Sequence, residues 1–142
     1  MKHFQFIICF FFASNCLFSQ TVVVEISGIR NTVGLIRLAF FANETDFRSD
    51  KPAFGRTHDK TLVLNGNLVV RLDHIPSGTY GIALLDDENK NGKLDYRLVI
   101  PKEGFGFSNY EHRGIKRPAL SDFSFLLKKN ETLRVPIRIK YY

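Results

Sequence analysis

Residues 62–84, LVLNGNLVVRLDHIPSGTYGIAL, contain the pattern that decides the fold. Apolar side chains recur at every second position on both sides of Asn65-Gly66, a dipeptide that favours a tight hairpin turn because both residues tolerate positive φ. A second turn signal, Pro76-Ser77-Gly78, precedes another alternating run. The pattern therefore predicts strands at 62–64, 68–72 and 80–84, with tight turns between them.

The same period of two extends toward both ends of the chain. Pro136 lies on the polar side of the last run and has no N–H to donate, which predicts an edge strand. About seven short strands without a convincing amphipathic helix are typical of an antiparallel β-sandwich. Residues 43–60 are expected to form a polar connection, and residues 86–122 a long loop insertion. The additional predicted strands are 22–26, 36–40, 123–125 and 133–139.

Residues 1–20 have the character of a secretory signal peptide. A short basic start is followed by an apolar stretch and then by a more polar end at Ser14, Asn15, Ser19 and Gln20. These polar residues interrupt a run that would need about 20 apolar residues to span a bilayer. Attachment of lipid at Cys16 is the alternative that stays open. We expect a secreted or periplasmic protein whose single domain covers residues 21–142, with no transmembrane span in the mature chain.

The positions of the cysteines and the net charge exclude some kinds of chemistry for the exported domain. Both cysteines, Cys9 and Cys16, precede residue 21, so the expected exported domain has no disulfide and no thiolate chemistry. Loss of Lys2 with the signal peptide leaves 19 basic against 14 acidic residues, a formal charge of +5. This excess fits either a soluble surface or attraction to an anionic envelope polymer or lipid headgroup.

Three segments in the middle of the chain resemble a known family. They are Leu72-Asp73-His74-Ile75-Pro76-Ser77-Gly78-Thr79-Tyr80, the acidic run 86–95, and Ile100-Pro101-Lys102-Glu103-Gly104-Phe105-Gly106-Phe107-Ser108-Asn109. The chain is similar to an uncharacterised family of small exported bacterial proteins, domain of unknown function 2141. The resemblance implies an exported β-sandwich in the style of transthyretin-like and carboxypeptidase-regulatory-like modules. It implies no activity.

The acidic run has the spacing of a calcium-binding loop. Asp87, Asn89, Asn91 and Asp95 occupy positions 1, 3, 5 and 9, Gly92 occupies position 6, and Lys93 would supply a main-chain carbonyl at position 7. Position 12, normally a bidentate Glu, is Leu98, so we expect low affinity unless Asp86 or Glu103 adds a ligand. The alternative is a turn stabilised by local hydrogen bonds that binds no ion.

The segment after this loop is the candidate ligand-binding surface. Glu103, Phe105, Phe107 and Asn109 place two aromatic rings beside glycines, a carboxylate and an amide, which suits stacking on a sugar or peptide. The rings would otherwise anchor the loop to the core. A short basic cluster of Arg113, Lys116 and Arg117 is either a solvated rim or a site for an anionic ligand.

Signals for catalysis are poor. The sequence contains no Gly-x-Ser-x-Gly elbow, no His-Glu-x-x-His, no phosphate loop and no dinucleotide fingerprint. We therefore expect a monomeric binding or structural module without catalytic residues. Its expected partner is an envelope glycan or protein and not a nucleic acid, and calcium is the ion that it could bind. A small periplasmic hydrolase or accessory enzyme using the acidic loop is the alternative, and a purely structural envelope protein is another.

Overall fold

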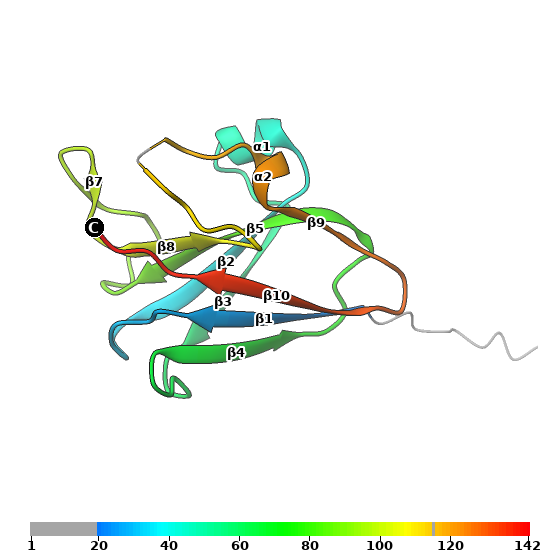
Figure 1. Ribbon diagram of the computed structural model, residues 1–142, viewed down its shortest axis with the longest axis horizontal. Coiled ribbons are helices and arrows are strands. Elements are labelled where there is room, and N and C mark those ends of the chain that lie inside the picture. Colours follow the sequence, from blue (N-terminus) through cyan, green and yellow to red (C-terminus); the bar gives the residue numbers. More distant parts are fainter. Residues whose placement is uncertain (1–19, 115) are drawn as a thin grey trace, which may run out of the picture.

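The computed structural model describes residues 20–114 and 116–142, which form an all-β sandwich (Figure 1). The bounds of its strands are β1 Thr21–Ser27, β2 Leu35–Phe41, β3 Phe54–Asp59, β4 Asn67–Leu72, β5 Gly78–Asp87, β6 Tyr96–Arg97, β7 Ile100–Pro101, β8 Gly104–Phe107, β9 Ser124–Leu127 and β10 Thr132–Arg138. Two short helices, α1 Glu44–Arg48 and α2 Leu120–Phe123, complete the elements.

Two sheets form the layers of the sandwich. The first sheet has the order β10-β1-β4, and the second has the order β3-β2-β5-β8, with β9 pairing along the other end of β5. Strands β6 and β7 form a separate two-stranded hairpin. The prediction of an all-β sandwich is confirmed, although β1 and β10 run parallel instead of antiparallel.

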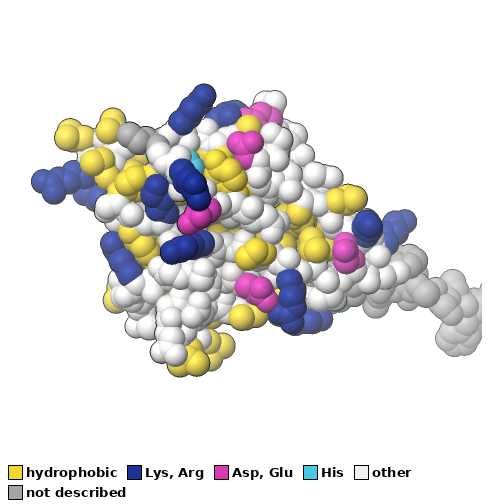
Figure 2. Space-filling model, in the orientation of Figure 1, with side chains coloured by type: hydrophobic (Ala, Val, Ile, Leu, Met, Phe, Trp, Pro, Cys, Tyr) yellow, Lys and Arg dark blue, Asp and Glu magenta, His cyan; other side chains and the backbone are white. Residues whose placement is uncertain are grey.

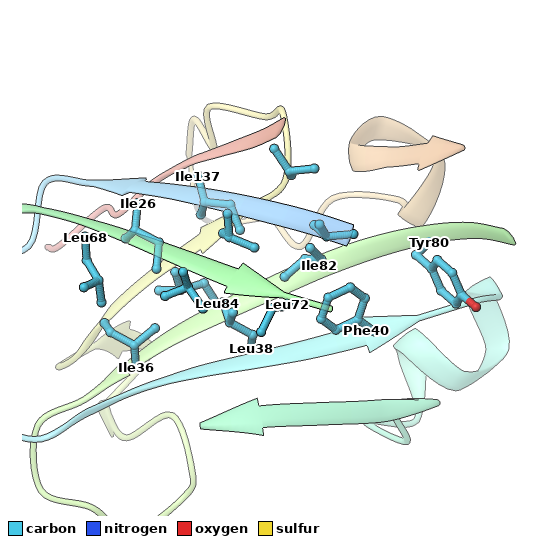
Figure 3. Packing of buried hydrophobic residues seen from close by; sticks show 14 of the residues in the cluster. Ile26, Ile36, Leu38, Phe40, Leu68, Leu72, Tyr80, Ile82, Leu84 and Ile137 are labelled. Atoms are coloured by element: carbon cyan, nitrogen blue, oxygen red, sulfur yellow. The ribbon is translucent and has the colours of Figure 1, made fainter. Parts of the chain in front are cut away.

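The core lies between the two sheets and follows the period of two in the sequence. Figure 3 shows Ile26, Leu68, Leu72 and Ile137 of the first sheet facing the inward residues of β2 and β5. Because successive side chains of a strand point to opposite faces, the alternating apolar positions all reach this interface. The inward residues of the second sheet are Ile36, Leu38, Phe40, Tyr80, Ile82 and Leu84.

The predicted strand at 62–64 is wrong. Leu62 and Leu64 are 80% and 73% exposed, and the chain there only bridges back to Asn67 around the Asn65-Gly66 turn, where both residues have positive φ as expected. The strand that precedes this turn is β3, within the segment predicted to be a polar connection. β3 and β4 belong to different sheets, so the segment between them passes from one layer to the other.

Both long irregular segments contain regular structure that was not predicted. The first also holds α1, whose N-cap Asn43 accepts a hydrogen bond from the backbone N–H of Asp46. The second, residues 86–122, supplies β8, a full member of the second sheet, and is therefore only partly a loop. Pro136 lies in β10, which pairs with β1 alone among the described strands, so the edge-strand prediction is confirmed.

The second sheet is covered on both faces, but unevenly on the outer one. Over one end, α1 and α2 pack on the sheet and enclose a second apolar cluster (Figure 1). Within residues 20–114 and 116–142, no helix lies over the other end of the outer face. The members of this second cluster are Phe41, Phe47, Phe107, Leu120 and Phe123.

The predicted signal peptide, residues 1–20, lies outside the described residues except for Gln20. Within the part of the chain that the structure describes, the helices are too short and too polar to cross a bilayer.

Candidate functional site

A groove lies on the outer face of the second sheet, and two cross-strand rows of side chains form its floor. The strand registers align one row of small residues with Phe107 and a second row with Phe105. Small side chains at the centre of a sheet leave space above the backbone, so the first row hollows the floor. The rows are Gly55, Ala39, Ala83 and Phe107, and then Thr57, Arg37, Leu85 and Phe105.

The walls of the groove come from segments far apart in the sequence. The β6–β7 hairpin and the preceding loop contribute Lys93, Leu94, Tyr96 and Val99 on one side, and the chain after β8 contributes residues of 112–118 on another. The volume of the open groove is about 670 Å³. This lies within the range of about 300–1,000 Å³ that is usual for small-molecule sites.

The groove carries an excess of positive charge. Arg37, Lys93 and Arg117 are among its lining residues, whereas Asp50 is the one carboxylate among the described residues that line it. Arg37 and Arg117 are partly neutralised, because they form ion pairs with Asp87 and Asp50.

A buried histidine also lines the groove. His112 is 7% exposed and packs against the rings of Phe105, Phe107 and Tyr110. Its Nδ1 has no hydrogen-bond partner among the described residues. Burial lowers the pKa of His112, and the charge of Lys140 lowers it further.

The Asp/Asn loop, residues 87–95, follows β5 directly at one end of this groove. The carboxylate of Asp87 is fully buried and accepts hydrogen bonds from Arg37 Nε and from the backbone N–H groups of Asn91 (3.0 Å) and Gly92 (2.9 Å). Burial alone would raise the pKa of Asp87, but these hydrogen bonds outweigh it, so the pKa is lowered. Asp87 is therefore a charged anchor for the loop.

The other predicted metal-site side chains converge within the same loop. The side-chain Nδ2 atoms of Asn89 and Asn91 both donate to Asp95 Oδ2, at 2.6 and 2.8 Å. Their Oδ1 atoms accept from the backbone N–H groups of Asn91 (3.0 Å) and Lys93 (2.8 Å). These local bonds are those of the predicted turn, and they also bring positions 1 to 9 of the calcium-loop spacing together.

Glu103 lies beneath the loop. It is 4% exposed, and its two carboxylate oxygens accept hydrogen bonds from the backbone N–H groups of Glu88 (3.1 Å) and Asp95 (3.3 Å). Glu103 therefore joins the two ends of the loop and is not presented to a partner. Glu88 points away from it, into a bidentate ion pair with Arg30 at 2.6 and 2.7 Å, which lowers the pKa of Glu88.

The other predicted ligand-binding residues lie in two different places: Phe105 and Phe107 line the groove, whereas Asn109 lies in a turn. Phe107 is 8% exposed and belongs to the second apolar cluster, while Phe105 is half-buried, and both line the groove. Asn109 is exposed, has positive φ and lies in the turn after β8, where its backbone N–H donates to Pro136 O at 2.9 Å. The aromatic rings are thus both core anchors and groove floor.

No cluster of three or more His, Cys, Asp and Glu side chains suited to hold a metal occurs among the described residues. An ion at the Asp/Asn loop would depend on amide and main-chain oxygens beside the carboxylates of Asp87 and Asp95. Another acidic residue of this region, Asp86, is fully buried and is paired with Lys60 and with the Tyr141 hydroxyl, which donates to it. Asp86 is therefore a structural residue and not an additional metal ligand.

The groove was not predicted from the sequence, although a signal was present. Ala39 and Ala83 occupy outward positions in strands whose inward positions are large and apolar. Charged or long polar side chains are usual at such positions when the outer face meets solvent. Alanine at these outward positions was therefore the feature of the sequence that could have indicated a groove on this face.

These features define the class of protein: a small all-β sandwich with a cationic groove on one sheet and an Asp/Asn loop at the end of that groove. Residues 24–134 match the model of a family described as an uncharacterised protein conserved in bacteria (DUF2141), and the chain belongs to this family. The family resemblance found in the sequence is thereby confirmed. No curated protein and no solved structure matches the chain.

Proposed function

We propose that this protein is an exported, non-catalytic binding or structural module whose Asp/Asn loop is stabilised by calcium. The observation that carries the proposal is the convergence of Asn89 and Asn91 on a single oxygen of Asp95, with Asp87 holding the backbone of the same loop. A hard cation requires several oxygen atoms around one point. The loop assembles the side chains that would supply them.

Binding of calcium would exchange some of the hydrogen bonds in the loop for ion contacts. Asp95 would release the two amide groups, and the oxygens of Asn89 and Asn91, with the carbonyl of Lys93, would contribute to coordination. Arg37 already pairs with Asp87, which reduces the negative charge available to a cation. We therefore expect a Kd of about 10⁻⁴ to 10⁻³ M, the range of extracellular calcium modules.

The role of such an ion would be ordering. The loop connects β5 to the β6–β7 hairpin, and Lys93 and Leu94 form part of the groove wall. An ion that fixes residues 87–95 would therefore also fix one side of the groove. The partner that we predict for the module is an envelope glycan or protein. We also predict that the module is secreted or periplasmic and is a monomer.

Thermal unfolding of the purified protein tests the calcium proposal. A ligand that binds only the folded state raises Tm with the logarithm of its excess over Kd. We expect a saturable rise in Tm when calcium is titrated from micromolar to tens of millimolar after EDTA treatment, and a much smaller rise with magnesium. A flat calcium series, or an equal response to magnesium, would contradict the proposal.

Asp95→Asn is the most informative variant for this titration. Asp95 is partly exposed, and among the described residues its carboxylate accepts hydrogen bonds from the two loop amides, whereas Asp87 is buried against Arg37 and its loss would disturb folding. The calcium response should vanish in Asp95→Asn. Glu111→Gln is the matched control, because Glu111 is an exposed carboxylate that pairs with Arg113 and Arg138 away from the loop. It should respond as the unmodified protein does.

The two alternative functions have their own tests. Turnover of chromogenic glycosides or esters, lost in Asp95→Asn, would favour a small hydrolase over a non-catalytic module. Co-isolation with one fixed envelope protein, together with a Tm that no ligand changes, would favour a purely structural role.

A further inference from the structure

We infer that the groove on the outer face of the second sheet binds a small amphiphilic organic anion: one apolar chain that carries a carboxylate or a similar acidic group. This site adjoins the proposed ion site, because Lys93 and Leu94 of the loop line the groove, but binding of the anion does not require calcium. Its evidence is the composition of the floor, the charge of the rim and one unpaired buried polar atom.

The floor suits an apolar chain. Ala39 and Ala83 form its centre, with Phe105 and Phe107 beside them. The volume of about 670 Å³ is ample for a single-chain molecule. Apolar area covered by such a chain is removed from water, which favours binding.

The hairpin wall carries apolar side chains that nothing in the described structure covers. Tyr96 and Val99, which line the groove, are 55% and 71% exposed, and their neighbour Leu98 is 95% exposed. In Figure 2, hydrophobic side chains gather where Figure 1 draws this hairpin, with Lys and Arg side chains next to them. Contiguous exposed apolar side chains of this kind mark interaction sites.

The rim supplies charge complementarity to an anion. Lys93 lines the groove and has no carboxylate within ion-pair distance among the described residues. A cationic rim above an apolar floor would hold the acidic group of the ligand at the edge and its chain within. A cationic amphiphile would be repelled.

His112 adds a polar group inside the groove. Its Nδ1 has no hydrogen-bond partner among the described residues although the side chain is 7% exposed, and buried polar atoms normally have one. The same histidine packs on Phe105 and Phe107, so the polar and apolar parts of the proposed site are adjacent.

Fluorescence titration with dansyl-labelled undecanoate, below its critical micelle concentration, tests the inference. We expect saturable binding of one probe per protein, with displacement by dodecanoate, weaker displacement by dodecanol and the weakest by dodecyltrimethylammonium. The loss of the acidic group should cost about tenfold in affinity. Equal displacement by the acid and the alcohol, or no binding, would overturn the proposal. The titration is made in EDTA and again in calcium, so that failure of the ion site does not affect the result.

Two variants test whether the probe binds in the groove. Ala83→Phe fills the centre of the floor and should weaken binding about tenfold or more, while Lys93→Gln should weaken the acid and leave the alcohol nearly unchanged. Val69→Phe is the matched control, because Val69 is 62% exposed on β4 of the other sheet. Probe binding that is equal in Ala83→Phe and Val69→Phe, with both variants folded by circular dichroism, would locate it elsewhere and overturn the assignment.

Discussion

At the scale of single residues, two side chains of the same type can have different roles because their surroundings differ. Asp86 and Asp87 are adjacent in the sequence and both fully buried, but Asp86 faces Lys60 and Tyr141 while Asp87 faces Arg37 and the loop backbone. Successive side chains of β5 point to opposite faces of the sheet, which explains the difference. One carboxylate stabilises the interior and the other the loop.

His112 makes the stability of the protein depend on pH. Its pKa is lowered in the folded state, mainly by burial, so the unfolded chain binds the proton more strongly. The stability that neutral His112 maintains is present above its ordinary pKa of 6.5 and is lost as the pH falls through the lowered value.

We therefore predict that His112→Phe flattens the loss of unfolding free energy between about pH 7 and pH 5. A phenylalanine ring would keep the contacts with Phe105 and Phe107. Urea unfolding at several pH values measures the effect. Some slope will remain in the variant, because burial also lowers the pKa of His58. Parallel pH profiles for the two proteins would contradict this role of His112.

At the scale of elements, the approach of β8 to the end of the chain closes one side of the sandwich. Phe105 and Lys140 exchange backbone hydrogen bonds of 3.1 and 2.8 Å, so the chain after β10 joins the second sheet to the first. Gly106 permits this contact. A Cβ atom at that position would lie 2.7 Å from the carbonyl oxygen of Arg138 and equally close to Ile137 Cγ2.

Gly106→Ala should consequently destabilise the protein by about 1–3 kcal/mol, the usual cost of forcing an extra methyl group into a packed interior. Gly55→Ala is the control, since a Cβ there meets only Leu38 O at 3.4 Å. Chemical denaturation of both variants measures the difference. An equal, small effect of the two substitutions would show that β8 and the C-terminal segment are not tightly packed.

At the scale of the whole molecule, a buried polar cluster ties together three distant parts of the chain. Lys60 follows β3, Asp86 belongs to β5 and Tyr141 is near the C-terminus, and the lysine and the aspartate have fully buried side chains. Burial, with the hydrogen bond to Asp86, raises the pKa of Tyr141. The fold therefore holds a charge pair at a place that water does not reach.

Lys60→Met should lower the unfolding free energy by about 3–5 kcal/mol, because it leaves the Asp86 carboxylate buried without its cation. The double variant Lys60→Met with Asp86→Asn should recover part of this loss, since no buried charge remains. Arg48→Met, which breaks the exposed pair with Glu44, is the control and should have little effect. A double variant less stable than Lys60→Met alone would contradict this account of the pair.

The sequence by itself determined the class of fold, the inward faces of β1, β2, β4, β5 and β10, the Asn65-Gly66 turn and the local arrangement of the Asp/Asn loop. These features depend on residues only a few positions apart, such as Asn89 with Asn91 or Ile36 with Leu38, so their pattern is visible along the chain. The loop hydrogen bonds follow from the preference of Asn and Asp for nearby backbone N–H groups.

Only the tertiary structure decided the parallel pairing of β1 with β10, the place of β3, the burial of Lys60 against Asp86 and the groove above Ala39 and Ala83. Each of these depends on segments that are distant in the sequence and that meet because the two layers must cover each other. The exposed leucines at 62 and 64 looked like a strand, whereas the polar residues of β3 did not, because packing against β2 outweighs local propensity. The groove has the same origin: strand registers align small residues across three strands beside Phe107 of the fourth, and no local pattern records which strands become neighbours.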